Sequence, residues 1–324
     1  MTVMILSLQI ALPLALITWV AFLPGRTWSR FGLQAAGTGA FLFALARVAQ
    51  WAVPAWWLPW VYGGLWLLVV LAGLARKRRA APRRVPNGLG GWAGIALSVV
   101  LLCVGGWYGA RAVMGRSLPE VEIVDISNPL GPGDYLVGNG GSNRLVNVHI
   151  ATLDLSVARF RPWRGQSYAV DFFGLGPWGL RARGWQPADP AAYAIFGAEL
   201  RAPCAATVVA TEGEMPDFEV PNSDQVNRLG NHVILRCGEA EIVLAHMRQS
   251  SVTVASGDPV GVGDLLGQVG NSGASTEPHL HIHAQRPAAI GAPPISGEPL
   301  ALRIEGRFLV RGDHLLGQPV NSSR

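Results

Sequence analysis

The stretch that decides the fold is Gly270-Asn271-Ser272-Gly273-Ala274-Ser275-Thr276-Glu277-Pro278-His279-Leu280-His281-Ile282-His283. Three of the seven histidines of the chain stand here, at every second position. Successive side chains of a β-strand point to opposite faces, so we expect His279, His281 and His283 on one face, with neighbours about 6.5 Å apart. At that spacing one imidazole can bind a metal while its neighbour acts on a water at that metal. The alternative is a histidine row on a loop or on a solvated strand face.

The chain divides by charge near Arg116. Residues 1–116 contain eleven Lys and Arg residues and no Asp or Glu, whereas residues 117–324 contain 15 Arg and all 21 acidic residues. The net charge of +5 is therefore the sum of +11 in the first part and −6 in the second. Because the basic part is also the apolar part, its charge gives no support to nucleic-acid binding. We expect no nucleic-acid partner.

The basic half predicts four membrane spans. Each candidate has about 17–21 mostly apolar residues, the length that crosses a hydrocarbon core of about 30 Å. The candidates are Met4–Leu23, Phe31–Ala49, Pro59–Ala75 and Gly90–Ala110. Nine of the twelve tryptophans lie in this half, several near predicted span ends, as expected for amphipathic rings at a membrane interface. The sequence therefore predicts an all-α, multi-pass region in a lipid bilayer.

The basic loops predict the orientation of these spans. Arg26 and Arg30 lie between the first two candidates, and six basic residues lie between the third and the fourth, in residues 76–84. Residues 50–58, between the second and the third candidate, carry none. Because basic loops remain in the cytoplasm, both chain ends are expected outside. Two arginines just beyond the last span count against this orientation but are outnumbered.

Residues 117–324 are then expected on the extracytoplasmic side. We predict a linker and the N-terminal part of this region in residues 117–165, and a folded domain in residues 166–324. Short runs of β-branched residues between Gly, Pro and Asn predict strands. These runs are Thr207–Ala210, His232–Arg236, Glu241–Ala245, Gly267–Val269 and Leu280–Ala284. No long amphipathic helix pattern accompanies them, so the domain is predicted to be mainly β.

The cysteines leave two alternatives open. Cys204 and Cys237 lie in the outer part, whereas Cys103 lies inside the fourth candidate span. An oxidising compartment permits a disulfide between Cys204 and Cys237. Two free thiols are the alternative, and the spacing matches no zinc-binding pattern.

Two residues outside the histidine row are further candidates for a site. His246 ends the apolar run Ile242–Ala245, and Asp171 stands in the apolar segment Tyr168–Phe173. A lone carboxylate among apolar residues is costly to bury unless a partner such as a metal compensates it. The alternatives are a structural histidine at a strand end and an aspartate that caps a turn before Gly174.

Four segments, in order, resemble the lysostaphin/LytM-type zinc endopeptidases of bacterial cell walls. They are Tyr168–Asp171, Gly230–Leu235, Leu244–Met247 and Gly270–His283. The turn-rich segment Val252–Gly267 is similar to the hairpin that precedes the His-x-His strand of that family. The resemblance is good over roughly residues 200–284 and looser over residues 166–173. It implies a lysostaphin-like, β-sandwich-like barrel, the LytM-type metallopeptidase domain, in residues 166–324.

The resemblance also implies roles for single residues. It makes Asp171 and His281 ligands of a Zn²⁺ ion, and His246 and His279 the pair that deprotonates the water at the metal and stabilises the oxyanion. A zinc ion held by three protein ligands keeps a position for water and lowers the pKa of that water towards neutral. At such a pH a neutral histidine is a suitable base. The implied function is cleavage of peptidoglycan peptides by a protein of the bacterial cytoplasmic membrane, with its C-terminal domain facing the wall.

One position departs from the family pattern. The first family motif is His-x-x-x-Asp, and Ser167 stands here in place of the histidine that would be the third ligand. His149, which lies 22 residues before Asp171, is the first candidate for the missing ligand, and His232 and His283 are substitutes. The alternative is a domain without a third ligand that binds peptidoglycan or regulates another wall hydrolase.

A second, weaker resemblance concerns Gly257–Gly270. Its Gly-Asp turns are similar to the hairpins of lipoyl- and biotinyl-carrier barrels. A carrier needs a lysine that can be modified, and the only lysine of the chain is Lys77 in the membrane half. The carrier function is therefore rejected, and the similarity only supports a related β-barrel fold.

Overall fold

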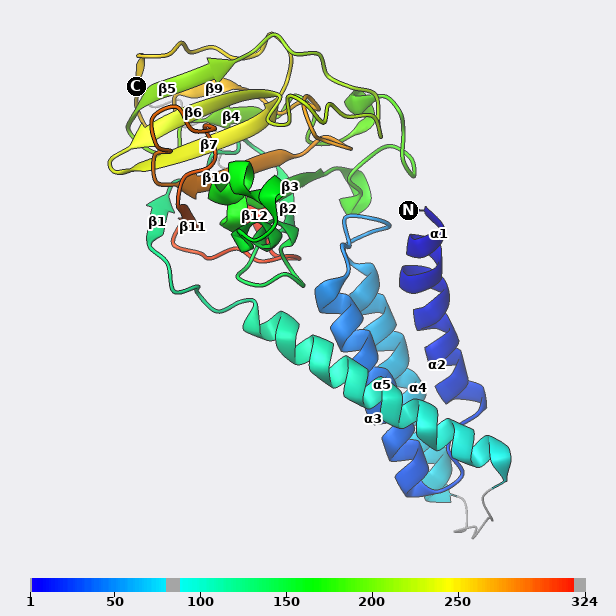
Figure 1. Cartoon of the computed structure of the whole chain (residues 1–324). Coiled ribbons are helices and arrows are strands. Elements are labelled where there is room, and N and C mark those ends of the chain that lie inside the picture. Colours follow the sequence, from blue (N-terminus) through cyan, green and yellow to red (C-terminus); the bar gives the residue numbers. More distant parts are fainter. Residues whose placement is uncertain (1, 80–87, 318–324) are drawn as a thin grey trace. The chain divides into compact units, whose positions relative to one another are not determined.

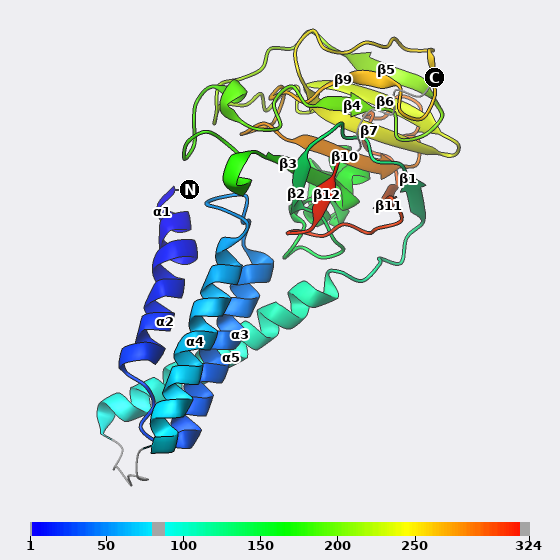
Figure 2. The same ribbon diagram turned by 180° about the vertical axis from the view of Figure 1, so that it is seen from behind.

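The computed structural model describes residues 2–79 and 88–317 (Figures 1 and 2). The chain forms two compact units that divide between Met114 and Gly115. The first unit is helical and corresponds to the basic, apolar half of the sequence. The second unit contains the histidine row.

The first unit, as far as it is described, is built from helices. Their bounds are α1 (Thr2–Ile5), the π-helical η1 (Leu6–Ala11), α2 (Leu12–Phe22), α3 (Trp28–Val48), α4 (Leu58–Arg79) and α5 (Leu89–Met114). Thr27 caps α3, because its side-chain oxygen accepts a hydrogen bond from the backbone N–H of Arg30. Large apolar side chains such as Leu68 and Trp107 are exposed on α4 and α5. An exposed surface of this kind suits contact with lipid.

Three of these helices are long and apolar enough to cross a membrane. They are Trp28–Val48, Leu58–Arg78 and Leu89–Met114 among the residues described. The first predicted span, Met4–Leu23, falls on the shorter apolar helix Leu6–Phe22, so a fourth crossing stays a prediction. Part of the basic loop that supported the orientation, with Arg83 and Arg84, lies outside the described residues.

The second unit is mainly β, as predicted, and follows the helical unit in the chain. The strands of its large sheet are β1 (Ile123–Ile126), β2 (Asp134–Asn139), β3 (Val170–Leu175), β5 (Ala206–Glu212), β6 (Asn231–Cys237), β7 (Ala240–Met247), β8 (Pro259–Val260), β10 (Leu280–Gln285), β11 (Pro299–Ile304) and β12 (His314–Leu316). Their order is β12-β2-β3-β10-β7-β6-β5-β8, and β11 pairs with both β10 and β1 beside this path. A separate two-stranded sheet joins β4 (Glu199–Arg201) to β9 (Leu265–Gln268).

The alternation of β10 separates the hydrophobic core from a polar row. Leu280, Ile282 and Ala284 are fully buried in the main core. His281 and His283, also buried, occupy the alternate positions of the strand and therefore the opposite face. Short 3₁₀ helices follow β2, namely η2 (Val148–Leu153) and η3 (Ala158–Tyr168), drawn as green coils beside β10 in Figure 1.

The segment expected as a linker and N-terminal part, residues 117–165, belongs to this unit. It contributes β1, β2, η2 and most of η3, and β1 pairs in parallel with β11. Two more 3₁₀ turns, η4 (Pro177–Gly179) and η5 (Pro190–Ala192), lie between β3 and β4. The sequence shows no long amphipathic pattern here, and in the described part of this unit the helical segments are 3₁₀ helices.

The structure decides between the two cysteine alternatives. Cys204 and Cys237 form a disulfide with their Cα atoms 6.1 Å apart, a usual separation for such a bond. The bridge joins the residues before β5 to the end of β6, two strands that already pair. Cys103 is a free cysteine.

Loss of this bridge is expected to destabilise the second unit. It closes a loop with a sequence separation of 33 residues, and such a closure restricts the unfolded chain by about 3–4 kcal/mol. We expect the Cys204→Ser/Cys237→Ser double variant to lose that much free energy of unfolding in urea titrations followed by the β-sheet circular dichroism signal. Cys103→Ser is the control. A double variant as stable as the parent would contradict this prediction.

Candidate metal centre

Four adjacent strands place the candidate residues in one row across the sheet. Asn139 on β2 pairs with Asp171 on β3, and Asp171 pairs with His281 on β10. His281 pairs on its other side with Ala245 on β7. Residues far apart in the sequence therefore meet because of strand register.

His246 enters this row through a β-bulge. Asn231 and His232 on β6 pair with Met247 and Ala245 on β7, which leaves His246 between them as the extra residue. Its φ of 62° is a left-handed conformation that is costly for a residue with a side chain and is often found at functional sites. Bulges redirect side chains, and the His246 ring lies 5.8 Å from the His281 ring, centroid to centroid.

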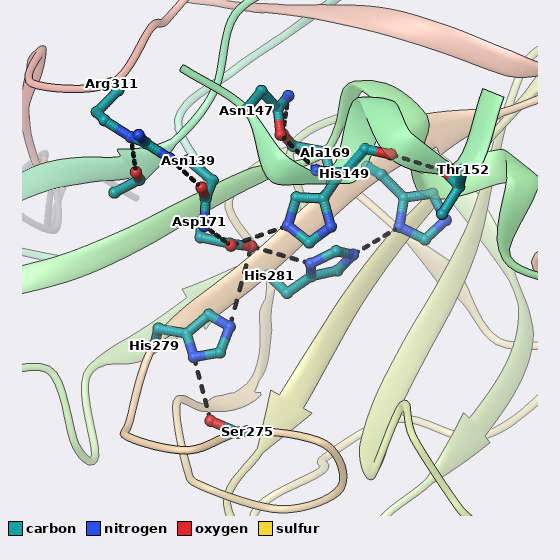
Figure 3. A network of polar contacts seen from close by, with 12 residues as sticks. Asn139, Asn147, His149, Thr152, Ala169, Asp171, Ser275, His279, His281 and Arg311 are labelled. Carbon is teal, nitrogen blue, oxygen red and sulfur yellow. Dashed lines mark hydrogen bonds and ion pairs between the residues drawn. The ribbon is translucent and has the colours of Figure 1, made fainter. Parts of the chain in front are cut away.

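Three side chains gather potential metal-binding atoms at the middle of the row (Figure 3). His149 Nε2 lies 2.9 Å from Asp171 Oδ2, and His281 Nδ1 lies 3.0 Å from Asp171 Oδ1. One such atom from each of the three residues lies within 4.8 Å of the others. Two imidazole nitrogens and one carboxylate oxygen are a donor set that zinc uses when a fourth position stays open. The residues present therefore fit a Zn²⁺ ion.

His149 reaches the centre because a buried amide fixes the start of η2. Asn147 Oδ1 accepts a hydrogen bond from the backbone N–H of His149 at 3.1 Å. Asn147 Nδ2 donates to the carbonyls of Gly141 and Ala169 at 3.1 and 3.0 Å. Ala169 stands two residues before Asp171, so one side chain holds both segments that carry these ligand candidates.

Ser167 belongs to a different hydrogen-bond network. Its buried hydroxyl donates to the carbonyl of Arg164 at 2.6 Å and contacts Thr152 Oγ1 at 2.8 Å. Thr152 Oγ1 in turn contacts the carbonyl of His149 at 2.8 Å. Ser167 thus supports the segment that presents His149.

The two substitutes for the third ligand do not belong to this group of donor atoms. His232 is on β6, and its Nδ1 contacts the carbonyl of Gly230 at 2.8 Å. His283 is on β10, and its Nδ1 lies 3.1 Å from His281 Nε2, on the far side of the His281 ring from Asp171. Of the three histidines that the sequence offered, the structure brings His149 to Asp171.

His279 and His246 lie beside the ligand candidates. His279 stands just before β10, with Nε2 3.9 Å from Asp171 Oδ1 and Nδ1 2.9 Å from the carbonyl of Glu277. His246 Nδ1 lies 2.9 Å from the carbonyl of Ser272, and the His246 and His279 ring centroids are 4.8 Å apart. A carbonyl oxygen only accepts, so Nδ1 carries the proton in both rings, and Nε2 of each neutral ring can accept one.

Burial and charge set the protonation states. Burial alone would raise the pKa of the Asp171 carboxyl, but His149, His281 and the nearby His279 together hold that pKa well below its usual range. Burial lowers the pKa of His281, and it lowers the pKa of His246 and of His283 well below the usual value. These pKa shifts favour the ionised carboxylate of Asp171 and the neutral imidazole of His281, the forms that bind a metal.

A comparison with protein families agrees with this geometry. Residues 193–292 match the model of peptidase family M23. This segment is an M23 peptidase domain. It contains His246, His279, His281 and His283, whereas His149 and Asp171 precede it in the chain. The expected relationship to the lysostaphin/LytM-type peptidases is thereby confirmed.

Solved peptidase structures are similar to part of the chain. Lysostaphin matches at 24% identity over 37% of this chain and 37% of its own, with a TM-score of 0.25. The catalytic domain of lysostaphin from Staphylococcus simulans matches at 22% identity over 37% of this chain and 81% of its own, with a TM-score of 0.22. A zinc-containing peptidase from Vibrio cholerae matches at 15% identity over 36% of this chain and 46% of its own, with a TM-score of 0.22.

The chain thus spans just over a third of the lysostaphin chain, and TM-scores this low support no argument about function. No curated protein matches the sequence.

Two residues that support the candidate metal centre carry no signal in the sequence. Asn139 Nδ2 donates to Asp171 Oδ2 at 2.8 Å, and Arg311 donates to Asn139 Oδ1 at 2.7 Å. Burial lowers the pKa of Arg311 to about 10, which leaves it charged at neutral pH. Neither residue belongs to a motif, and only the pairing of β2 with β3 and the path of the chain after β11 bring them to Asp171.

Proposed function

We propose that the chain is a membrane-anchored zinc endopeptidase that hydrolyses peptide bonds in bacterial peptidoglycan. The observation that carries the proposal is the group of His149, Asp171 and His281 within 4.8 Å, with His246 and His279 beside it. The M23 match supports hydrolysis of peptide bonds. The three long apolar helices support attachment to a bilayer.

In this proposal His149, Asp171 and His281 hold the metal. Zinc, when bound, supplies Lewis-acid activation of water and of the peptide carbonyl. His149 takes the place of the histidine that the family has four positions before the aspartate. Its ring lies 4.9 Å from the ring of His281, centroid to centroid, so the two rings flank the Asp171 carboxylate together.

His279 and His246 accept and donate the protons of the reaction in this proposal. With Nδ1 bonded to the Glu277 carbonyl, His279 can accept the proton of the attacking water at Nε2. His246, whose Nδ1 contacts the Ser272 carbonyl, can likewise accept a proton at Nε2. Either ring, once protonated, can donate a hydrogen bond to the developing oxyanion and return the proton to the leaving amine.

Digestion of purified sacculi tests the proposal. The zinc-loaded full chain in detergent is expected to release fragments with new amino termini, detected by end labelling and chromatography. Tight binding to sacculi at full zinc occupancy without new amino termini would overturn the enzyme and support the non-catalytic alternative. That alternative is a domain that binds peptidoglycan or regulates another wall hydrolase. Ser167, at the position where the family has a ligand histidine, favours this alternative only if His149 does not bind the metal.

His283 is predicted to fix the orientation of His281. It is fully buried, and its Nδ1 lies 3.1 Å from His281 Nε2. If Nδ1 of His281 binds the metal, its Nε2–H donates a hydrogen bond to His283 Nδ1 and so fixes the ring, as the outer ring N–H of a metal-bound histidine commonly does with other acceptors. We expect His283→Ala to lower zinc affinity by about 10–100-fold in chelator competition. His283→Gln keeps an acceptor and should lose less, whereas equal affinity in parent and His283→Ala would contradict this role.

The orientation in the membrane has its own test. The basic residues between the third and fourth predicted spans support a cytoplasmic position of that loop and an outside position of both chain ends. A reporter that is active only outside the cytoplasm is expected to work when fused after Arg324 and to fail when fused after Arg79. The reverse pattern would contradict the orientation and would separate the M23 domain from the cell wall.

A further inference from the structure

A pocket of about 460 Å³ lies within the helical unit. The end of α2 and the turn after it form one side, and the first turns of α3 and of α5 form the others. Trp19, Leu23 and Ile95 give it an apolar part, and Arg26 and Arg30 give it a basic part. A pocket of this volume is large enough for a small ligand or a lipid headgroup.

The positive charge at this pocket has no counterpart in its own unit. Residues 1–116 contain no Asp or Glu, so no carboxylate side chain of the unit can neutralise Arg26 or Arg30. A third cation is close, because Lys77 Nζ donates to the carbonyl of Arg26 at 3.2 Å. Like charges gathered in this way repel one another unless an anion lies between them.

Glycines form part of the wall that α5 contributes. Gly90, Gly91 and Gly94 on the first turns of α5 line the pocket. A Cβ atom at Gly91 would lie 3.1 Å from a terminal nitrogen of Arg30, a tight contact. Gly88, Gly90 and Gly91 at the start of α5 line the pocket, and the N-terminal end of this helix adds partial positive charge there, which favours anions.

Buried polar contacts fix the shape of the pocket. The almost fully buried Gln34 accepts a hydrogen bond from the backbone N–H of Gly25 at 2.9 Å. Its amide nitrogen lies 3.4 and 3.3 Å from the carbonyls of Trp19 and Leu23. One side chain on α3 therefore holds the end of α2 and the turn that carries Arg26.

The pocket lies at the end of the helical unit that we expect at the cytoplasmic membrane surface. The ends of α2 and α4 and the starts of α3 and α5 lie at the same end of the helical unit (Figures 1 and 2). This end carries the basic residues that we expect at the cytoplasmic surface, where anionic lipids are abundant and basic pockets between helices bind their headgroups.

We propose that this pocket binds the phosphate of an anionic phospholipid, with Arg30 as the main contact and the Trp19, Leu23 and Ile95 side against the lipid backbone. The proposal rests on membrane insertion of the helices and is independent of peptidase activity. Arginine suits the role because its planar fork donates two hydrogen bonds to one phosphate. Free phosphate offers the same contacts, so the test separates the two sources.

The experiment measures retention of dioctanoyl phosphatidylglycerol on the detergent-purified full chain by native mass spectrometry, with dioctanoyl phosphatidylcholine as reference. Parent protein is expected to retain phosphatidylglycerol selectively, and Arg30→Gln to lower its affinity about 10-fold or more, the usual size for a lost charged hydrogen bond. Arg47→Gln, on the same helix outside the pocket, is the matched control and should bind as the parent does. Circular dichroism verifies the helices of each variant.

A second variant separates the pocket from general surface attraction. Gly91→Leu keeps every charge but fills the space before Arg30, and it is expected to weaken phosphatidylglycerol binding as much as Arg30→Gln does. Equal retention of both lipids by the parent, or unchanged binding in Gly91→Leu, would overturn the proposal. Displacement of phosphatidylglycerol by millimolar inorganic phosphate would show that the site recognises the free anion, and it would overturn the lipid assignment.

Discussion

Replacement of His281 by alanine is expected to remove zinc from the purified chain. In the proposed site the ring supplies one of three donors, and its Nδ1 lies 3.0 Å from the carboxylate proposed as another. Losing a residue that only supports a ligand already costs about 10–100-fold in affinity, so losing the ligand should exceed 100-fold. Elemental analysis after dialysis against a zinc-buffered solution measures the effect. His149→Ala is expected to behave in the same way.

Two variants serve as matched controls for this result. His232→Ala removes a histidine outside the donor group, whose ring contacts the Gly230 carbonyl, and it should keep the zinc content of the parent. Ser167→Ala removes the hydroxyl that stands at the family's ligand position but contacts Arg164 and Thr152, and it should lower zinc affinity far less than His281→Ala does. Full zinc content in His281→Ala would show that the ligand assignment is wrong.

Replacement of His279 by alanine is expected to abolish hydrolysis and to leave zinc in place. Its Nδ1 is held by the Glu277 carbonyl and its Nε2 lies 3.9 Å from Asp171 Oδ1, a geometry that suits proton transfer beside the metal. General acid–base catalysis contributes about 10²–10⁴-fold to rate, and kcat should fall by that factor. The rate is measured on a soluble peptidoglycan peptide, and zinc is determined in the same preparation.

His246→Ala gives the comparison for His279→Ala. Both variants should retain one zinc per chain and an unchanged KM, because neither ring is expected to bind the metal. Combined replacement should cost little more than the first replacement, since residues that act as a unit are not additive. Loss of zinc in parallel with activity would instead assign these histidines to the metal.

Much of the fold follows from local patterns in the sequence. The five β-branched runs lie on β5, β6, β7, β9 and β10, with ends that differ by a few residues. The spacing of the histidines predicted a strand with His279, His281 and His283 on one face. The structure places His281 and His283 on β10, opposite the buried Leu280 and Ile282, whereas His279 stands just before the strand. The apolar composition of the first half likewise corresponds to helices with exposed apolar side chains.

The remaining features depend on contacts that no local pattern encodes. The choice of His149 over His232 depends on Asn147, whose amide binds both η2 and the residue before β3. Asn139 and Arg311 reach Asp171 only through the register of β2 with β3 and through the return of the chain after β11. The conformation of His246 results from a bulge opposite β6, which is set by pairing and not by the sequence of β7 alone.

Zinc X-ray absorption spectroscopy of the zinc-loaded full chain tests the central claim most directly, because it counts imidazole ligands. We expect nitrogen and oxygen ligands at about 2.0–2.2 Å, scattering from two imidazole rings, and no sulfur at about 2.3 Å. His149→Ala, measured at saturating zinc, should show one imidazole fewer. An unchanged imidazole signal in His149→Ala would contradict the claim that His149 replaces the ligand missing at Ser167.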